Sequence, residues 1–494
     1  MRRFFAATLL SAAVCLAQPQ NLAERVHQAN QMLAAGRYAE AAKIYEEAVR
    51  AIPDDPGLRT NLGMAYHLSG REKEAIEQFQ IALKRQPGIV PAMVMMGAAY
   101  LRLGQPAKAV APLREVSSAV PNLVEARQML AEALEALGRH REALPHYRAW
   151  TALTPKNPKA WYGLGRAYEA LAGEVSEQLK KVAPESAYMV ALVAAAQLDR
   201  QLYRSAFYLY REALRRGRPL RLWHHAVAEI YRRTGHPDWA AKEEENARSV
   251  PAPDCRAAPA ACAFRDGRYE RVIEILENHN DPESLYWQGM ACRELARKAF
   301  ERLEALPPSA ELHAWKARRL EARKLYGEAV SEWKKALDLA PGNPVFEREL
   351  AVAYRLNEDY AAARPLAERL LERDPDSPDL NYLLGHILLN QQQPEAAARY
   401  LEKAVKAAPQ FLPAHSSLGL AYLQLNRDRD AVVHLQAALP IDTDGRLRFR
   451  LARAYQRLGD TDRAREFMKQ YQQIRSRVEK ERKSAQQELQ ITPP

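Results

Sequence analysis

The sequence predicts an all-α protein, a right-handed α-solenoid superhelix of stacked helix-turn-helix repeats. Proline and small residues recur at intervals of 34 residues, and glycine is scarce, with 21 glycines against 31 prolines in 494 residues. β-Sandwiches and phosphate-binding α/β enzymes use more glycine in their turns. A fixed interval of this length is typical of one small structural repeat stacked many times. The recurring prolines are Pro53, Pro87, Pro121, Pro155, Pro341, Pro375 and Pro409.

Each repeat is predicted to contain two helices. Leu62 and Tyr66 are spaced for one face of a helix, and Gly70 then stops that helix. A second helical run follows until Pro87, which cannot continue a helix. Because one hairpin cannot bury its apolar faces alone, neighbouring hairpins are expected to stack. Alanines that keep the 34-residue interval in the second helix, where they let the two helices approach closely, are Ala41, Ala75, Ala109, Ala143, Ala329, Ala363, Ala397 and Ala431.

These residues resemble the tetratricopeptide repeat family. The resemblance extends from about Leu22 to Gln473. It implies stacked hairpins whose first helices line a concave groove in which partner peptides bind. The residues that carry the match are Trp161, Leu164, Gly165 and Tyr168 in WYGLGRAY, Leu62, Gly63 and Tyr66, and Leu418, Gly419 and Tyr422.

Five segments are expected along the chain. Residues 1–17 form a signal peptide, and residues 18–157 form an N-terminal array of four repeats. Residues 158–309 form an irregular, elongated helical segment that includes a loop with cysteines and prolines. Residues 310–475 form a C-terminal array. Residues 476–494 form a capping helix and a polar tail, because a solenoid needs a polar cover at its open end.

The first segment has the order of a secretory signal peptide. Arg2 and Arg3 provide a positive start, residues 4–16 are apolar, and Ala17 is a small residue at the end. The apolar run is shorter than the about 20 residues that span a bilayer. A short N-terminal helix of the fold and a lipoprotein signal at Cys15 are the alternatives. We therefore expect an exported protein, periplasmic or extracellular, that is cleaved after Ala17.

The middle segment breaks the 34-residue interval. Residues 161–214 resemble residues 285–337, which indicates a duplicated repeat with an extra helical stretch before the next hairpin. Between the copies lie one ordinary repeat and the loop that holds Cys255 and Cys262. In an oxidising compartment these two cysteines are candidates for a disulfide, and free thiols are the alternative. Cys292 is the remaining cysteine of this segment.

No pattern in the sequence predicts catalysis. Phosphate-loop, zinc-protease and nucleophile-elbow motifs are missing. His224 and His225 point about 100° apart on a helix and do not suit one metal ion. The run Glu243–Glu245 is interpreted as a solvated face. We expect no enzyme activity, no cofactor and no metal site; an enzyme site in the irregular middle segment is the weakest hypothesis.

A second acidic pattern lies near the C-terminus. Asp442, Asp444 and Gly445 begin like a calcium-binding loop, but apolar residues occupy the later ligand positions. We therefore interpret this stretch as a turn and a helix cap.

The family resemblance also implies which residues line the groove. By register they are Asn30, Asn61, Met64, His67, Met95, Met129, Tyr162, Arg166, Tyr382 and His386. The two asparagines match those of repeats that clamp the C-terminal carboxylate of chaperones, whereas Val26, Pro91 and Met95 occupy the basic positions of that clamp. The three methionines indicate an adaptable apolar groove instead. Ordinary packing between repeats is the alternative for the methionines.

The charge of the chain is mildly positive. The net charge is +11, from 72 Lys and Arg against 61 Asp and Glu. This is not the dense basic patch that nucleic-acid binding needs. Arg446, Arg450, Arg453 and Arg457 are spaced to form one basic helix face near the C-terminus, although a solvated end repeat would show the same spacing.

Together these observations favour an exported, non-enzymatic scaffold that mediates protein–protein interactions through its concave groove. Its partners would be other proteins or peptides, and no nucleic acid is expected. The alternative is a cell-envelope assembly factor that binds an anionic polysaccharide or lipid through the arginine face. The sequence leaves the identity of the partner and the oligomeric state open.

Overall fold

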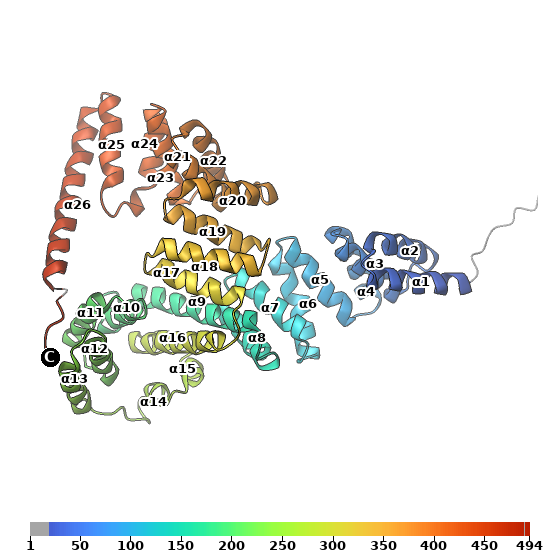
Figure 1. Ribbon diagram of the computed structural model, residues 1–494, viewed down its shortest axis with the longest axis horizontal. Coiled ribbons are helices and arrows are strands. Elements are labelled where there is room, and N and C mark those ends of the chain that lie inside the picture. Colours follow the sequence, from blue (N-terminus) through green and yellow to red (C-terminus); the bar gives the residue numbers. More distant parts are fainter. Residues whose placement is uncertain (1–18, 489) are drawn as a thin grey trace, which may run out of the picture. The chain divides into compact units, whose positions relative to one another are not determined.

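The computed structural model describes residues 19–488 and 490–494, and all regular structure in these residues is helical (Figure 1). Consecutive helices pack on one another through most of the chain. The all-α fold of stacked hairpins is therefore confirmed. The predicted signal peptide, residues 1–17, lies outside the described residues.

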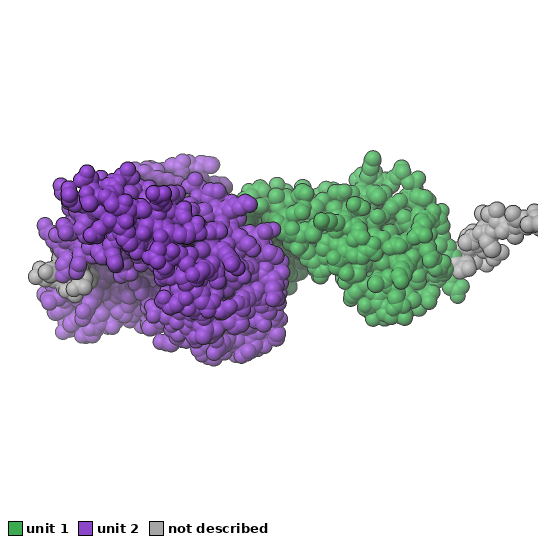
Figure 2. Space-filling model, turned by 90° about the horizontal axis from the view of Figure 1, so that it is seen from above, with its two compact units in different colours: residues 1–168 green, residues 169–494 purple. Residues whose placement is uncertain are grey.

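The chain forms two compact units, residues 1–168 and 169–494, which Figure 2 shows in different colours. Unit 1 contains four helix hairpins, and α9 (Pro158–Val182) follows them. Each helix of the four hairpins packs against the next one in the chain. These helices are α1 (Pro19–Ala34), α2 (Tyr38–Ala51), α3 (Pro56–Leu68), α4 (Glu72–Arg85), α5 (Val90–Arg102), α6 (Pro106–Ala119), α7 (Val124–Ala136) and α8 (His140–Leu153).

Unit 2 contains the remaining helices and ends with a long helix. Its first part comprises α10 (Ala187–Asp199), α11 (Tyr203–Arg216), α12 (Arg221–Arg233), α13 (Pro237–Ser249), α14 (Pro259–Arg265), α15 (Tyr269–Ile275) and α16 (Pro282–Glu304). Its second part comprises α17 (Ala310–Ala322), α18 (Tyr326–Leu339), α19 (Pro344–Leu356), α20 (Tyr360–Arg373), α21 (Pro378–Asn390), α22 (Pro394–Ala407), α23 (Leu412–Gln424), α24 (Asp428–Ala437), the short 3-10 helix η1 (Leu439–Ile441), α25 (Arg446–Arg457) and α26 (Thr461–Glu488).

The two helices of each hairpin approach closely because small residues face bulky ones. A Cβ atom built on Gly63 would lie 2.6 Å from the Phe79 ring, and one on Gly419 would lie 2.7 Å from Leu435. The close approach of the two helices that the sequence predicts is thereby confirmed. The alanines of the second helices, Ala41, Ala75, Ala109, Ala143, Ala329, Ala363, Ala397 and Ala431, are all fully buried.

The turn inside each hairpin closes with one backbone hydrogen bond and a residue of positive φ. In the α3–α4 turn, Gly70 has φ +83° and the Arg71 amide donates to the Tyr66 carbonyl at 2.8 Å. Glycine holds this position in several turns, but non-glycine residues hold it in five others. This explains part of the low glycine content. The five residues are Gln201, Lys324, Glu358, Gln392 and Asn426.

Two long helices interrupt the regular stack. Helix α9 has 25 residues and α16 has 23, and each is followed by an ordinary hairpin. This agrees with the duplicated, elongated repeat that the sequence predicts. Every residue from Ser284 to Cys292 in α16 is buried, so this stretch is covered on all sides, whereas Arg297 and Lys298 further along the helix are exposed. Within unit 2, Gln178 donates to Asn280 at 2.7 Å across 102 residues of sequence.

The turn geometry predicts that Gly70→Ala lowers the free energy of unfolding by roughly 1–2 kcal/mol, because a Cβ is strained at positive φ. No atom lies within 4 Å of the added carbon, so the loss comes from the backbone alone. The matched control is Gly173→Ala inside α9, which also has open space around it. It should instead raise stability by roughly 1 kcal/mol. Urea denaturation measures both changes, and a Gly70→Ala midpoint equal to that of the unaltered chain would contradict the assignment.

Candidate partner-binding surface

The first helix of a hairpin is tied to the proline that precedes it. The side chain six residues after the proline donates a hydrogen bond to the proline carbonyl, as Arg59 does to Pro53 at 2.9 Å. We call this contact the proline-carbonyl bond. The residue types differ between repeats, but the acceptor is the same. Further examples are Arg127 to Pro121 at 3.1 Å, Trp161 to Pro155 at 2.8 Å, Asn381 to Pro375 at 2.8 Å and His415 to Pro409 at 3.0 Å.

A second series of hydrogen bonds joins neighbouring hairpins. A tyrosine of the first helix bonds to a side chain 20 residues earlier, on the second helix of the preceding hairpin. Tyr66 donates to Glu46 at 2.9 Å, and Tyr422 donates to Glu402 at 2.7 Å. Burial and the bond to Glu46 raise the pKa of Tyr66 to about 12. We call this series the 20-residue bond; it fixes the first helices that carry this tyrosine against the hairpin before them.

First helices lie on the tighter side of each array. In unit 1, α3 packs on α5 and α5 packs on α7, whereas the intervening second helices pack on one another less closely. In unit 2, α21 packs on α23 in the same way. A stack that is tighter on one side curves toward that side. The first helices therefore form the inner face of each array, where the predicted groove residues belong.

The three predicted methionines lie on first helices of unit 1 and are half-buried. Met64 and Met95 pack against the core cluster that includes Leu62 and Phe79. Met129 packs against a separate cluster that includes Val94. Each methionine thus contributes to packing between helices and also leaves part of its side chain exposed. Their role in binding remains a prediction.

The structure places the predicted polar groove residues of unit 1 in different surroundings. Asn30 is exposed, and its side-chain oxygen accepts a 2.5 Å hydrogen bond from the Tyr45 hydroxyl. Asn61, Tyr162 and Arg166 are half-buried. Asn30 is therefore partly engaged in holding its own hairpin together.

His67 corrects the groove prediction. Its side chain is only 6% exposed, and Nδ1 lies 2.5 Å from a carboxylate oxygen of Glu72. Arg102 donates to the other oxygen of Glu72 at 2.8 Å and to the His67 carbonyl at 2.9 Å. His67 therefore belongs to a buried polar cluster that joins α3, α4 and α5. It offers little surface to a partner.

Tyr382 and His386 lie together on α21 in unit 2. The Tyr382 ring packs on Phe411 at 5.0 Å and on His386 at 5.8 Å between centroids. His386 Nδ1 lies 3.4 Å from the Ser417 hydroxyl oxygen. Burial lowers the pKa of His386 to about 4. The imidazole is therefore neutral at physiological pH.

The arginine face on α25 is less basic than its sequence spacing indicates. Arg446 pairs with Asp444 at 2.8 Å, and Arg457 pairs with Asp428. Burial lowers the pKa of Arg450 below its ordinary value. Arg453 is exposed. Two of the four charges are thus balanced by neighbouring carboxylates.

The calcium-like stretch near α25 is a cap, as predicted. Asp442 is buried and accepts hydrogen bonds from the backbone amides of Leu447 at 3.0 Å and Arg448 at 3.2 Å. Asp444 accepts from the Arg446 amide at 3.0 Å. These carboxylates satisfy amides of the first helical turn, which have no partner inside the helix.

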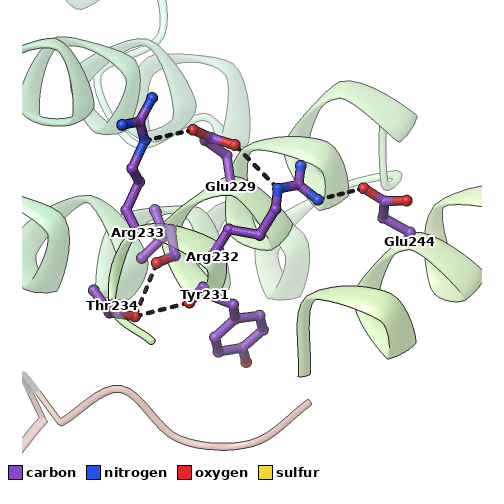
Figure 3. Close-up of polar contacts among 7 residues, drawn as sticks. Glu229, Tyr231, Arg232, Arg233, Thr234 and Glu244 are labelled. Carbon is purple, nitrogen blue, oxygen red and sulfur yellow. Dashed lines mark hydrogen bonds and ion pairs between the residues drawn. The ribbon is translucent and has the colours of Figure 1, made fainter. Parts of the chain in front are cut away.

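The interpretation of Glu243–Glu245 as a solvated face is wrong for Glu243. This side chain is fully buried and accepts from His224 at 2.6 Å and from Asn246 at 3.2 Å. Burial raises the pKa of Glu243, but these two hydrogen bonds outweigh it and hold that pKa below its ordinary value. Glu244 is half-exposed and pairs with Arg232 at 2.5 Å (Figure 3).

The burial of Glu243 had a detectable signal in the sequence. His224 and Glu243 are 19 residues apart, which joins the first and second helices of one hairpin. The same spacing joins His313 to Glu332 at 2.7 Å. Polar residues of complementary type at this spacing therefore indicate an internal pair rather than a solvated face.

The cysteine loop between α13 and α14 is closed by a disulfide. Cys255 and Cys262 are bonded, with their Cα atoms 5.5 Å apart. Cys292 is buried in α16. Among the described residues, no three His, Cys, Asp or Glu side chains gather as a metal site would require. No helix in the described part of the chain combines the length and apolar character that crossing a membrane requires.

Comparison with protein families identifies repeats in both arrays. Four models described as tetratricopeptide repeat match this sequence, and no curated protein matches it. The matched residues are 32–95, 91–122, 124–167, 320–387, 354–410 and 445–477.

Solved structures with similarity to this chain each cover about a third of it. Residues 41 to the end of MamA from Desulfovibrio magneticus RS-1 are 24% identical with a TM-score of 0.31, covering 33% of this chain and 94% of that chain. YrrB, described as a TPR protein with an unusual peptide-binding site, is 25% identical with a TM-score of 0.28. That match covers 29% of this chain and 74% of YrrB.

The buried histidines predict a loss of stability in acid. Burial lowers the pKa of His386 and of His146 to about 4, whereas an unfolded histidine has a pKa near 6.5. Between these values the unfolded chain binds more protons, so the free energy of unfolding falls as the pH drops from about 6.5 to about 4. The slope is roughly 1.4 kcal/mol per pH unit for each such histidine.

Urea denaturation at several pH values tests this dependence. His386→Gln should reduce the acid-induced loss between pH 6.5 and 4, because the side chain no longer titrates. His225→Gln is the control, since His225 is exposed. An unchanged pH profile in His386→Gln would show that the histidine is not held neutral in the folded state.

Proposed function

We propose that this chain, which belongs to the tetratricopeptide repeat family, is an exported scaffold that binds partner proteins along the inner face of unit 1. Repeats of this family mediate protein–protein interactions. The observation that carries the proposal is the set of half-buried methionines on successive first helices, Met64, Met95 and Met129. We further propose that the chain positions its partners and catalyses no reaction.

Methionine suits such a surface for a physical reason. Its unbranched side chain has three rotatable bonds and a polarizable sulfur, so it adapts to partners of different shape. The part of each methionine that packs on the core keeps the residue in place, while the exposed part remains available. The partner that fits is an apolar peptide segment or an amphipathic helix.

Rigidity of the inner face supports binding. The proline-carbonyl bond ties α3 and α7 to the prolines that precede them. Hydrogen bonds of Tyr66 and Tyr100 with side chains 20 residues earlier join α3 and α5 to the preceding hairpin. A surface that is already ordered loses little conformational entropy when a partner binds. The stack can therefore bind an extended partner without reorganising its backbone.

Two observations support export. Residues 1–17 have the order of a signal peptide, and Cys255 and Cys262 are joined by a disulfide. Disulfides persist in oxidising compartments and are rare in the cytosol. The arginine face of α25 does not favour binding to an anionic polymer, because Asp444 and Asp428 balance two of its four arginines.

Partner binding is tested by replacing the methionines with a charged residue. The combined variant Met64→Glu, Met95→Glu and Met129→Glu should lose partners that the unaltered chain recovers from the exported fraction, because three carboxylates would have to be desolvated at the interface. The matched control places glutamates at exposed apolar residues on the second-helix side of unit 1: Ile81, Val120 and Leu153. Equal recovery of partners by both variants would rule out the inner face.

Export is tested separately by mass spectrometry of the chain purified from its natural source. We expect a chain that begins at Gln18 and contains the Cys255–Cys262 disulfide. A chain that retains residues 1–17, or that carries two free thiols in this loop, would contradict the export proposal. The methionine experiment does not depend on this outcome.

A further inference from the structure

The segment Gln490–Pro494 contacts a hairpin far away in the sequence. The Tyr231 hydroxyl on α12 donates to the Thr492 carbonyl at 2.7 Å across 261 residues. Figure 1 shows α26 leading from α25 toward α11, α12 and α13, where this segment ends. In Figure 3 the Tyr231 ring points toward the ribbon of the segment. Both elements belong to unit 2.

This contact replaces a missing partner in the 20-residue bond. In this register Tyr66 donates to Glu46 and Tyr422 donates to Glu402, whereas Tyr100 and Tyr168 accept hydrogen bonds from Gln80 and Arg148. The residue 20 positions before Tyr231 is Arg211, and a guanidinium has no acceptor to offer. Burial raises the pKa of Tyr231 to about 12, so its proton stays in place at neutral pH. The Thr492 carbonyl provides the acceptor that the repeat lacks.

Aromatic rings pack around Tyr231; Phe207 is buried, and Trp239 and His236 are half-buried. The Tyr231 ring contacts Phe207 and Trp239 with centroids 5.5 and 5.7 Å apart. The His236 ring stacks on Trp239 at 4.0 Å. Such surfaces recognise extended proline-containing segments, whose backbone carbonyls remain free to accept hydrogen bonds.

A cleft of about 820 Å³ lies beside this aromatic cluster. The α10–α11 turn lines one side of it with residues 201–205, and Thr234 and His236 line another. Leu202 in this turn is 43% exposed. Gln490 and Ile491 complete the lining, and Ile491 is half-buried whereas its neighbours in the segment are exposed.

The sequence of the segment suits an extended conformation. Thr492 precedes Pro493, and Pro493 precedes Pro494, so both residues are steered away from helical backbone angles. An extended chain directs the Thr492 carbonyl and the Ile491 side chain to separate contacts. One contact is the Tyr231 hydroxyl and the other is the cleft.

We propose that this cleft and Tyr231 form a second peptide-binding site, separate from the methionines of unit 1, whose occupant is the chain's own segment Gln490–Pro494. The segment is recognised by one backbone carbonyl, one apolar side chain and the extended form that two prolines impose. Bound there, it straps the end of α26 to the α12–α13 hairpin. Release of the segment opens the cleft on the side that Gln490 and Ile491 line and leaves Tyr231 without its acceptor.

Hydrogen exchange followed by mass spectrometry tests this site in the intact chain and in a chain that ends at residue 489. Removing residues 490–494 should raise amide exchange in residues 201–205 and 231–236, which line or flank the cleft. Ile491→Gly in the full chain should have the same effect, because it removes the apolar side chain that the segment places against the cleft. Equal exchange in the intact and shortened chains would overturn the proposal.

Tyr231→Phe isolates the hydrogen bond. One net hydrogen bond corresponds to a loss of about fivefold to tenfold in the equilibrium for segment binding, so exchange should lie between the intact and shortened chains. The matched control is Tyr422→Phe, whose hydroxyl donates to Glu402 within the C-terminal array. It should leave exchange around the cleft unchanged. An identical response to both substitutions would show that the Thr492 contact does not hold the segment.

A peptide added in trans distinguishes a binding site from simple proximity. A peptide of residues 486–494, capped at both ends, should restore protection around the cleft in the shortened chain at millimolar concentration, which is the effective concentration of a short flexible tether. It should not protect Tyr231→Phe to the same degree. Failure of the peptide to protect the shortened chain would overturn the assignment of the cleft as a binding site.

Discussion

A lone helix hairpin leaves an apolar face uncovered, and in this chain the next hairpin covers it. The two helices must first approach closely, which is why Gly63 faces the ring of Phe79 and why Ala75 is fully buried. Apolar packing of this kind has no strong directional preference. The orientation is supplied by polar contacts, namely the proline-carbonyl bond within a repeat and the 20-residue bond between repeats. The inner face of unit 1 is a product of both.

Helix packing that recurs at a constant interval leaves a pattern in the sequence, and such packing could be predicted. Bulky and small side chains recur every 34 residues because each hairpin meets the same neighbour, and this interval predicted the hairpins. The break in the interval and the likeness of two segments predicted the elongated repeats, and the residue types at Asp442, Asp444 and Gly445 predicted the cap. The polar contacts were missed because their spacings are 19 and 20 residues and their residue types vary. Glu243 was misjudged for this reason. The contact of Tyr231 with Thr492 spans 261 residues, and no repeat interval could have predicted it.

The two units differ in how far apart in sequence their contacts reach. In unit 1, helices pack on their chain neighbours and on the next first helix. In unit 2, residues 284–292 of α16 are buried on all sides, and Trp223 donates to Tyr286 at 2.9 Å across 63 residues. Arrays with neighbour contacts only have stabilities that are sums of local terms. Unit 2 adds long-range contacts to that scheme, so its middle repeats depend on one another.

The long-range contacts of unit 2 give the molecule an uneven response to tension. In unit 1, a hairpin at the end of the array can detach without disturbing distant ones, and each released repeat would lengthen the chain by about 110–120 Å. In unit 2, a hydrogen bond joins Gln178 in α9 to Asn280, which lies just before α16. A second hydrogen bond joins Tyr231 to Thr492. A force applied to the two ends of that unit acts on these hydrogen bonds first, and the helices between them bear the force only after the hydrogen bonds break. Unit 1 is therefore expected to extend one repeat at a time, whereas unit 2 resists extension until its long-range contacts break.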